Sequence, residues 1–315
     1  MRILCLLVAM LLAQKMYCQD SLDNILNNEI KVQQALKPAK VFATFKGTHL
    51  INARTNETIK KKEIDFRVSH RFGDIAGEYG GEKSFFGLEN STDIKISFDY
   101  GITDRLTAGI SRAKGATAIR QLYEGSLKYK VLEQTENNSM PISITAFSSA
   151  VVSSMKSNSK INTPDHFDGF SDRMAYTGQL IIARKFSDRF SLMLIPTFVH
   201  TNYVISSDQN DMWAMGVGGR LKITKRMSLI VDYFKTFRGS KSIAEFKAKG
   251  LKFYNPLGIG LEFETGGHVF DFNFTNSTAL LENQFIPYTT TSWLMGQFRW
   301  GFNISRIFSF KKNTK

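Results

Sequence analysis

Apolar and polar residues alternate along most of this chain, and this period of two constrains the fold more than any other feature of the sequence. Ile64, Phe66 and Val68 alternate with charged or hydroxyl neighbours, and the pattern recurs in residues 93–100, 257–264 and 270–275. Because successive side chains of a β-strand point to opposite sides, each of these segments has one apolar and one polar face. The chain is therefore predicted to be all-β.

Alternating strands suit two architectures. In a soluble sandwich the apolar face meets a second sheet, whereas in a membrane barrel it meets lipid and the polar face lines the lumen. The segments here run about nine to twelve residues, which matches the length that a tilted strand needs to span a bilayer. A length of 315 residues suits one large β domain. We therefore favour a single antiparallel transmembrane β-barrel over a sandwich.

Turn signals divide the pattern into about twelve strands. Three tight turns share the order hydroxyl, charge, Arg, apolar, hydroxyl, at residues 103–107, 187–191 and 224–228, whereas the opposite connections are long and polar. Outer-membrane barrels show this asymmetry, with the short turns in the periplasm. The strands are predicted at residues 63–72, 93–102, 106–112, 121–132, 141–152, 173–186, 190–200, 211–223, 227–235, 255–265, 268–276 and 297–310.

The residues before the first of these strands do not fit the scheme. Residues 41–52 also alternate, but a thirteenth strand would start the barrel on the wrong side of the membrane. Either this segment packs in or below the lumen, or the count is wrong elsewhere. The apolar residues within 20–37 recur at helical spacing, and this pattern ends before Pro38. Residues 19–40 are therefore predicted to be a periplasmic lead-in with one short helix, and insertion of that helix into the lumen as a plug is the alternative.

The first eighteen residues have the features of a cleaved secretory signal. Arg2 precedes an apolar run at residues 3–12 that is too short to cross a bilayer as a helix. We predict cleavage near Cys18, which removes both cysteines, Cys5 and Cys18. Residues 41–315 are predicted to be the barrel domain. The mature chain then has no disulfide, Cys-ligated metal or Cys nucleophile. Together with the strands, this predicts the bacterial outer membrane as the location and its lipid as a partner.

The charge balance is basic, with a formal net charge of +13. This excess suits an anionic membrane surface, and export together with the lack of a basic-aromatic module argues against nucleic acid as a partner. The chain ends on a strand rich in aromatic residues and a short Lys-rich tail. We interpret this end as the part that the barrel-insertion machinery reads. The sequence specifies no oligomeric state.

The polar faces of the strands carry both signs of charge. A pore selective for one type of ion favours one sign of charge at its constriction. Mixed charge therefore indicates either a lumen held together by ion pairs or a narrow pore for small polar solutes. We expect a narrow channel or transport protein for small solutes of unspecified identity, and the alternative is a sealed structural barrel. The candidates for lining the lumen are Asp65, Arg67, Lys95, Asp99, Lys128, Glu262, Glu264, Asp271 and Arg299.

Nothing in the sequence points to catalysis, a cofactor or a metal, and the chain is predicted not to be an enzyme. No phosphate loop, dinucleotide fingerprint or catalytic triad is present, and no histidine pair has the i, i+2 spacing of a metal site on one strand face. His70 is predicted to face lipid. A lipid-hydrolysing Ser–His site at this position is the less favoured alternative to a protein without enzymatic activity. Ser69 points to the other side and does not complete such a pair.

In combination, several motifs resemble a family of uncharacterised bacterial outer-membrane β-barrels, classified as a domain of unknown function. The resemblance covers most of residues 41–310 and implies the compartment and the barrel, but no ligand or reaction. Residues 53–62 depart from the glycine-rich, His-bearing stretch of the family, so no role of that stretch is carried over. The resembling segments are TFKGT (44–48), DFRVSHRFG (65–73), YGITDRL (100–106), IARKFSDRFS (182–191), GVGGR (216–220), ETGGHVF (264–270), FTNS (274–277) and GFNISR (301–306).

Overall fold

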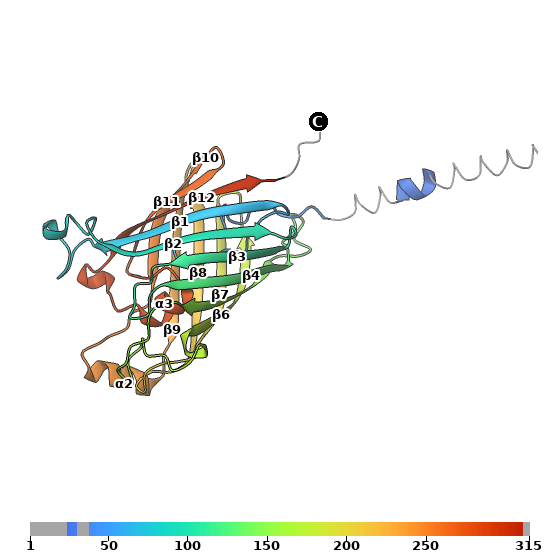
Figure 1. Ribbon diagram of the computed structural model, residues 1–315. Coiled ribbons are helices and arrows are strands. Elements are labelled where there is room, and N and C mark those ends of the chain that lie inside the picture. The colour runs from blue at the N-terminus through green and yellow to red at the C-terminus, as the bar shows by residue number, and fades with distance from the viewer. Residues whose placement is uncertain (1–23, 30–37, 311–315) are drawn as a thin grey trace, which may run out of the picture.

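The computed structural model describes residues 24–29 and 38–310, and its strands form a closed β-barrel (Figure 1). Each strand pairs antiparallel with its sequence neighbours, and β1 closes the barrel by pairing with β12. The all-β barrel of about twelve strands is thus confirmed. The strands are β1 (Glu63–Asp74), β2 (Ser91–Gly101), β3 (Leu106–Ala113), β4 (Leu122–Leu132), β5 (Ser143–Ser153), β6 (Met174–Lys185), β7 (Phe190–Thr201), β8 (Asp211–Lys222), β9 (Met227–Phe237), β10 (Leu257–Thr265), β11 (His268–Thr275) and β12 (Arg299–Ser309).

Alternation sorts the side chains of every strand to the two sides of the wall. In β2, the polar residues from Asp93 to Asp99 are buried, while Ile94, Ile96 and Phe98 between them are exposed. Elsewhere the outer face is equally apolar: Ile110 is 68% exposed. Large apolar side chains exposed in a continuous band suit contact with lipid acyl chains. The pattern that predicted the strands also makes this band.

The two ends of the barrel differ: the connections at one end are short turns apart from residues 133–142, and those at the other end are longer loops (Figure 1). The shared turn motif has a physical basis, because its first hydroxyl accepts a hydrogen bond from the backbone three residues later. Thr103 Oγ1 lies 2.9 Å from the nitrogen of Leu106, and Ser187 and Thr224 repeat the contact. The long loops contain α2 (Ser240–Ala248), α3 (Glu282–Tyr288), η1 (Glu82–Ser84), η2 (Ser171–Arg173) and η3 (Trp293–Met295).

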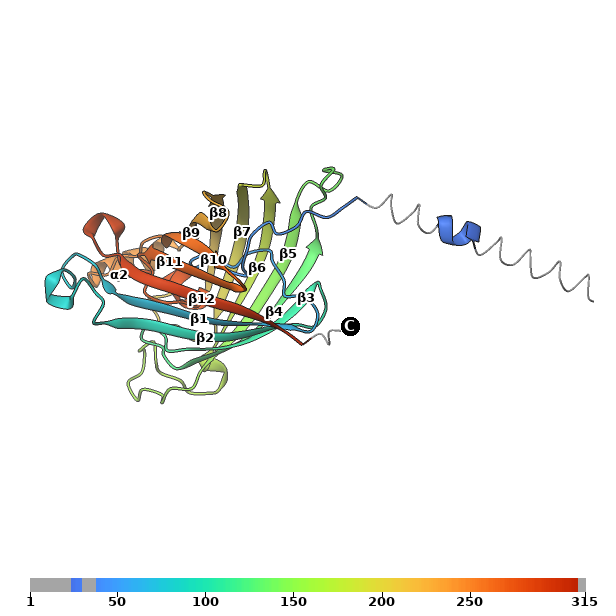
Figure 2. The same cartoon turned by 90° about the horizontal axis from the view of Figure 1, so that it is seen from above.

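Residues 41–59, which we call the plug, form no barrel strand, and most of them lie buried inside the barrel (Figure 2). The plug enters at the short-turn end, where the nitrogen of Val41 donates to the carbonyl of Gln134 at 2.8 Å. It turns back on itself at residues 50–53, where the nitrogen of Leu50 donates to the carbonyl of Ala53 at 2.8 Å. It then returns to the same end to begin β1. Packing in the lumen is therefore the correct reading of residues 41–52.

The rest of the N-terminal region is described only in part. Residues 24–29 are helical and exposed, so this part of the predicted lead-in helix does not pack in the lumen. The remainder of that helix and the predicted signal at residues 1–18 lie outside the described residues. Among the described helices, none is both long and apolar enough to cross a membrane.

Candidate functional site

The lumen wall is apolar on one side and charged on the other. The inward residues of β5 to β9 include Phe147, Ile181, Met193, Ile195 and Phe234, all buried in one cluster. The inward residues of β1, β2, β4, β10, β11 and β12 instead include most of the charged side chains. A segment that fills this lumen must therefore offer both apolar and polar contacts.

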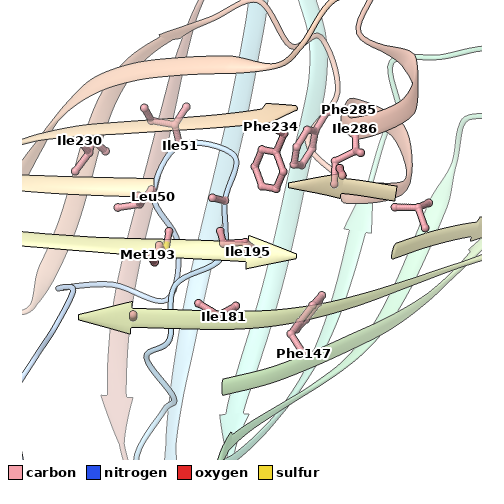
Figure 3. Close-up of a cluster of buried hydrophobic side chains, with 14 of the residues drawn as sticks. Leu50, Ile51, Phe147, Ile181, Met193, Ile195, Ile230, Phe234, Phe285 and Ile286 are labelled. Atoms are coloured by element: carbon pink, nitrogen blue, oxygen red, sulfur yellow. The ribbon is translucent and has the colours of Figure 1, made fainter. Parts of the chain in front are cut away.

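The apolar side of the lumen receives two segments that enter from opposite ends (Figure 3). Leu50 and Ile51 come from the tip of the plug, while Phe285 and Ile286 come from α3 in the loop between β11 and β12. The rings of Phe285 and Phe234 pack edge to face, with centroids 5.3 Å apart. The plug and the loop thus share one apolar core inside the barrel.

Glycines in the wall make room for the tip of the plug. A Cβ at Gly218 would lie 2.9 Å from Cδ1 of Leu50, and a Cβ at Gly258 would lie 2.7 Å from Cγ2 of Ile51. Real Cβ atoms do not approach other heavy atoms this closely. The glycine run at residues 216–219, ambiguous in sequence between wall bending and close packing, therefore includes a position that packs against a side chain in the lumen.

Polar side chains of the wall, including Asp232 of β9 on the apolar side, bind the backbone of the plug directly. Asp232 Oδ2 accepts hydrogen bonds from the nitrogens of Asn52 and Ala53, at 2.6 and 2.8 Å. Arg71 Nη2 donates to the carbonyl of Ile51 at 2.8 Å, and Asn303 Nδ2 donates to the same carbonyl at 3.4 Å. Buried backbone groups need such partners. Here the wall provides them in place of a β-ladder.

The contacts continue toward the short-turn end of the plug. Lys128 Nζ lies 3.2 Å from the carbonyls of both Thr48 and Glu57. Thr107 Oγ1 accepts a hydrogen bond of 2.9 Å from the nitrogen of Ile59. Both arms of the plug are therefore fixed to the wall.

Arg54, on the plug, links three parts of the molecule. Its guanidinium donates to Glu124 of β4 and to Glu282 of α3, each at 2.6 Å, and its carbon Cζ lies 4.1 Å from the ring centre of Phe147. All three charged side chains are at most 3% exposed. Glu124 also binds Lys95 at 2.8 Å. Because removing one partner of a buried ion group leaves a charge without compensation, Arg54 holds plug, wall and loop together.

The nine residues proposed from sequence to line the lumen fall into several groups. Eight of them are buried, and the side chain of Glu264 is 20% exposed. Lys95 joins the Arg54 group and Lys128 binds the plug, while Glu262 and Glu264 both bind Arg220, at 2.7 and 2.8 Å. Asp65 pairs with Arg67 at 3.4 Å, Asp271 accepts from Asn303 at 3.0 Å, and Arg299 pairs with Asp74. Their role in solute passage remains a proposal.

Sequence reasoning missed Arg54, Arg71 and Glu282. Arg54 follows the alternating segment at residues 41–52, so its place in the lumen becomes evident only when the plug is known. Glu282 lies beside the apolar run Ala279, Leu280 and Leu281. An apolar run in a loop is the one signal that points to a loop folded inward.

A smaller charged cluster holds the start of the plug at the short-turn end. Lys40 and Arg105 both bind the carboxylate of Glu133, which lies in the turn after β4. Partial burial acts to raise the pKa of Glu133, but hydrogen bonds from Lys40 and Arg105 outweigh it and hold the pKa below its usual range. Glu133 therefore stays ionised at neutral pH and anchors the chain where it enters the barrel.

On the outer face, His70 lies among aromatic side chains. His70 stacks on Phe302 with ring centres 5.4 Å apart and contacts Phe72 at 4.3 Å. Ser69 is buried on the opposite side of the wall. Within the described residues, no group of three His, Cys, Asp or Glu side chains is arranged to hold a metal ion.

Comparisons with known proteins bear on the whole barrel. A family model described as "Membrane bound beta barrel domain (DUF5777)" matches residues 45–308. An outer membrane channel from Pseudomonas putida F1 is similar in structure, with a TM-score of 0.48, 12% identity, and coverage of 80% of this chain and 98% of that one. The NanC porin has a TM-score of 0.46 and 8% identity, with coverage of 79% and 99%. The comparison with curated proteins gives no match.

Proposed function

The chain belongs to the family of membrane-bound β-barrel domains, and from this premise we propose that it is a plugged channel of the bacterial outer membrane, which passes small solutes when its plug moves. Family membership confirms the resemblance predicted from the motifs. The exposed apolar band suits a lipid surround, and closed barrels of this kind are the outer-membrane architecture. The family description names no solute.

One observation carries the proposal: both ends of the plug leave the lumen at the same end of the barrel. The plug can therefore withdraw without unthreading and without breaking any strand pair of the wall. A twelve-strand barrel lies between barrels filled by their own side chains and those that hold an open channel. Here a removable segment accounts for much of the filling.

The closed state is strongly favoured. Leu50 and Ile51 are almost completely buried, and burial of each such side chain contributes about 1.5–3 kcal/mol. The hydrogen bonds of Asp232, Arg71 and Lys128 to the plug add to this. We therefore expect the unmodified protein to conduct rarely. The same filling of the lumen favours the second candidate function, a sealed structural barrel without transport.

Planar-bilayer conductance of Arg54→Ala separates the two functions. The variant leaves Glu282 without its cation, while Glu124 keeps Lys95 and Ser111. Breaking a buried ion group costs about 3–5 kcal/mol, and about 1.4 kcal/mol already changes the ratio of open to closed states tenfold. Mean conductance should rise at least tenfold over wild type. Arg189→Ala, in a short turn, is the control and should match wild type.

Persistent silence of Arg54→Ala would establish the sealed barrel, provided that the variant keeps the heat-dependent gel mobility of a folded barrel. Glu282→Gln is the milder companion variant, because it keeps the shape of the side chain and removes the charge. It should raise conductance less than Arg54→Ala does.

We propose no enzymatic role. His70 is packed between aromatic rings on the lipid face, and Ser69 lies on the other side of the wall. Purified protein should release no fatty acid from phospholipid vesicles. Release that is lost in His70→Ala would replace this view with that of a lipid-face hydrolase.

A further inference from the structure

We infer that the lumen is a binding site for the main chain of peptides, and that the channel's solutes are short peptides with apolar side chains. The inference rests on the proposed function and names its substrate class. It starts from the plug itself, which is a peptide bound inside the barrel.

The wall binds the backbone of the plug directly, in addition to plug side chains such as Asn52 and Arg54. Asp232 accepts from two successive backbone nitrogens, at 2.6 and 2.8 Å. Arg71, Asn303 and Lys128 donate to backbone carbonyls. Contacts of this kind do not depend on the sequence of the bound segment, so another peptide can make them.

The same wall provides room for apolar side chains beside these polar groups. Leu50 lies against Gly218, and Ile51 lies against Gly258, which borders Asp232. Main-chain contacts with adjacent spaces for side chains are a general mode of peptide recognition, and here they hold the turn of the plug. These apolar contacts and the main-chain contacts of Asp232, Arg71 and Asn303 lie within one stretch of four plug residues, 50–53.

Physical chemistry favours a peptide over other polar solutes. When the plug leaves, Asp232 loses two backbone N–H donors and the side-chain amide of Asn52, and Arg71 and Lys128 lose carbonyl acceptors. Leaving a buried charged group without hydrogen-bond partners costs more free energy than leaving a neutral group without them. A solute that restores the partners therefore lowers the barrier to opening. A peptide offers donors and acceptors in alternation together with apolar side chains. A saccharide offers hydroxyl groups, and it leaves the apolar side of the lumen without matching contacts.

Uptake into liposomes that contain the full chain tests the inference. The probe is the labelled nonapeptide THLINARTN, the sequence of residues 48–56, with blocked ends. It is compared with the same peptide N-methylated at the two nitrogens that correspond to Asn52 and Ala53, and with a linear glucose oligosaccharide of equal mass. The unmodified peptide should enter about tenfold faster than the methylated one, the size of effect expected for hydrogen bonds to a charged group. The oligosaccharide should be no faster than the methylated peptide.

The variant Asp232→Asn tests whether Asp232 causes the preference for the unmethylated peptide. This variant weakens the acceptor at nearly constant shape, so the difference between the two peptides should shrink to less than threefold. Ser228 is another inward residue of β9, so Ser228→Ala is the control. It should keep the full difference in uptake between the two peptides. If Asp232→Asn does not fold, the pair of peptides on wild type decides the question alone.

Two failures are distinguishable. If ions and the oligosaccharide pass through Arg54→Ala but the peptide enters no faster than its methylated form, the peptide inference is wrong and the channel stands. If no solute passes through wild type or Arg54→Ala, both the channel and the peptide inference are wrong.

Discussion

At the scale of single residues, closure of the lumen depends on a few side chains that meet the plug. Arg54 joins Glu124 and Glu282, and Asp232 takes two backbone hydrogen bonds. Gly258 has no side chain and so leaves space for Ile51, because a Cβ at Gly258 would overlap with Ile51. These residues act on the plug and not on the strand ladder. Changes in them are therefore expected to open the lumen before they unfold the barrel.

Gly258→Val should displace the tip of the plug. Its Cβ would lie 2.7 Å from Ile51 and 2.9 Å from Oδ1 of Asp232, and such overpacking costs about 1–3 kcal/mol. Trypsin added on the short-turn side should cleave within the plug, at Lys46 or Arg54, faster than in wild type. Gly178→Val is the matched control, because a Cβ at Gly178 meets nothing within 4 Å. Equal cleavage in all three proteins would show that the plug does not rest on Gly258.

The anchor at Glu133 gives a pH dependence. Because the folded pKa of Glu133 lies below its ordinary value of about 4.3, the anchor contributes fully above that value and is lost as the pH falls through the depressed folded pKa. A spin label on Ala39→Cys should thus be immobile at pH 7 and become mobile as the pH falls through the depressed pKa of Glu133. In Glu133→Gln the label should be mobile at pH 7 and below. A label that is immobile in this variant at pH 7 would contradict the anchor.

At the scale of elements, the strands follow from the sequence and the lumen contents do not. All twelve predicted strands agree with the observed ones within two residues at each end, because alternation and the hydroxyl-bearing turns are local signals. Residues 41–52 alternate as well, but their hydrogen-bond partners are side chains of barrel strands, and Asp232 lies 180 residues from its partner Asn52. The inward fold of α3 likewise depends on contacts with β9 and the plug. Long-range partners of this kind leave no periodic trace in sequence.

The lipid-facing register yields a matched pair of variants. Ile96, near the middle of β2, is 41% exposed on the outer face, whereas Ser126 of β4 is half-buried on the inner face. Ile96→Arg should cost about 2–4 kcal/mol in a bilayer, and Ser126→Arg much less. Refolding yield into liposomes, read from heat-dependent gel mobility, measures the difference. Equal yields, or a lower yield for Ser126→Arg, would mean that the assigned faces are wrong.

At the scale of the whole molecule, the barrel is closed from both ends by its own chain. The plug enters from the short-turn end and α3 enters from the long-loop end, and they meet at Arg54 and Glu282 and in one apolar cluster (Figure 3). An event at either end can therefore reach the other through this contact. Of the arrangement as a whole, the sequence predicted the wall and the asymmetry of its ends, together with mixed charge inside.

The central claim is that the plug gates the lumen, and a reversible crosslink tests it most directly. Asn52 Nδ2 lies 3.3 Å from Thr275 Oγ1, so cysteines at both positions can be joined by a short reducible crosslinker, and the natural cysteines Cys5 and Cys18 lie within the predicted signal. The pair is placed in the Arg54→Ala background, and conductance is recorded before and after reduction. The account predicts silence while the crosslink is intact and current after reduction. Equal current in both states, with the crosslink verified by mass, would contradict it.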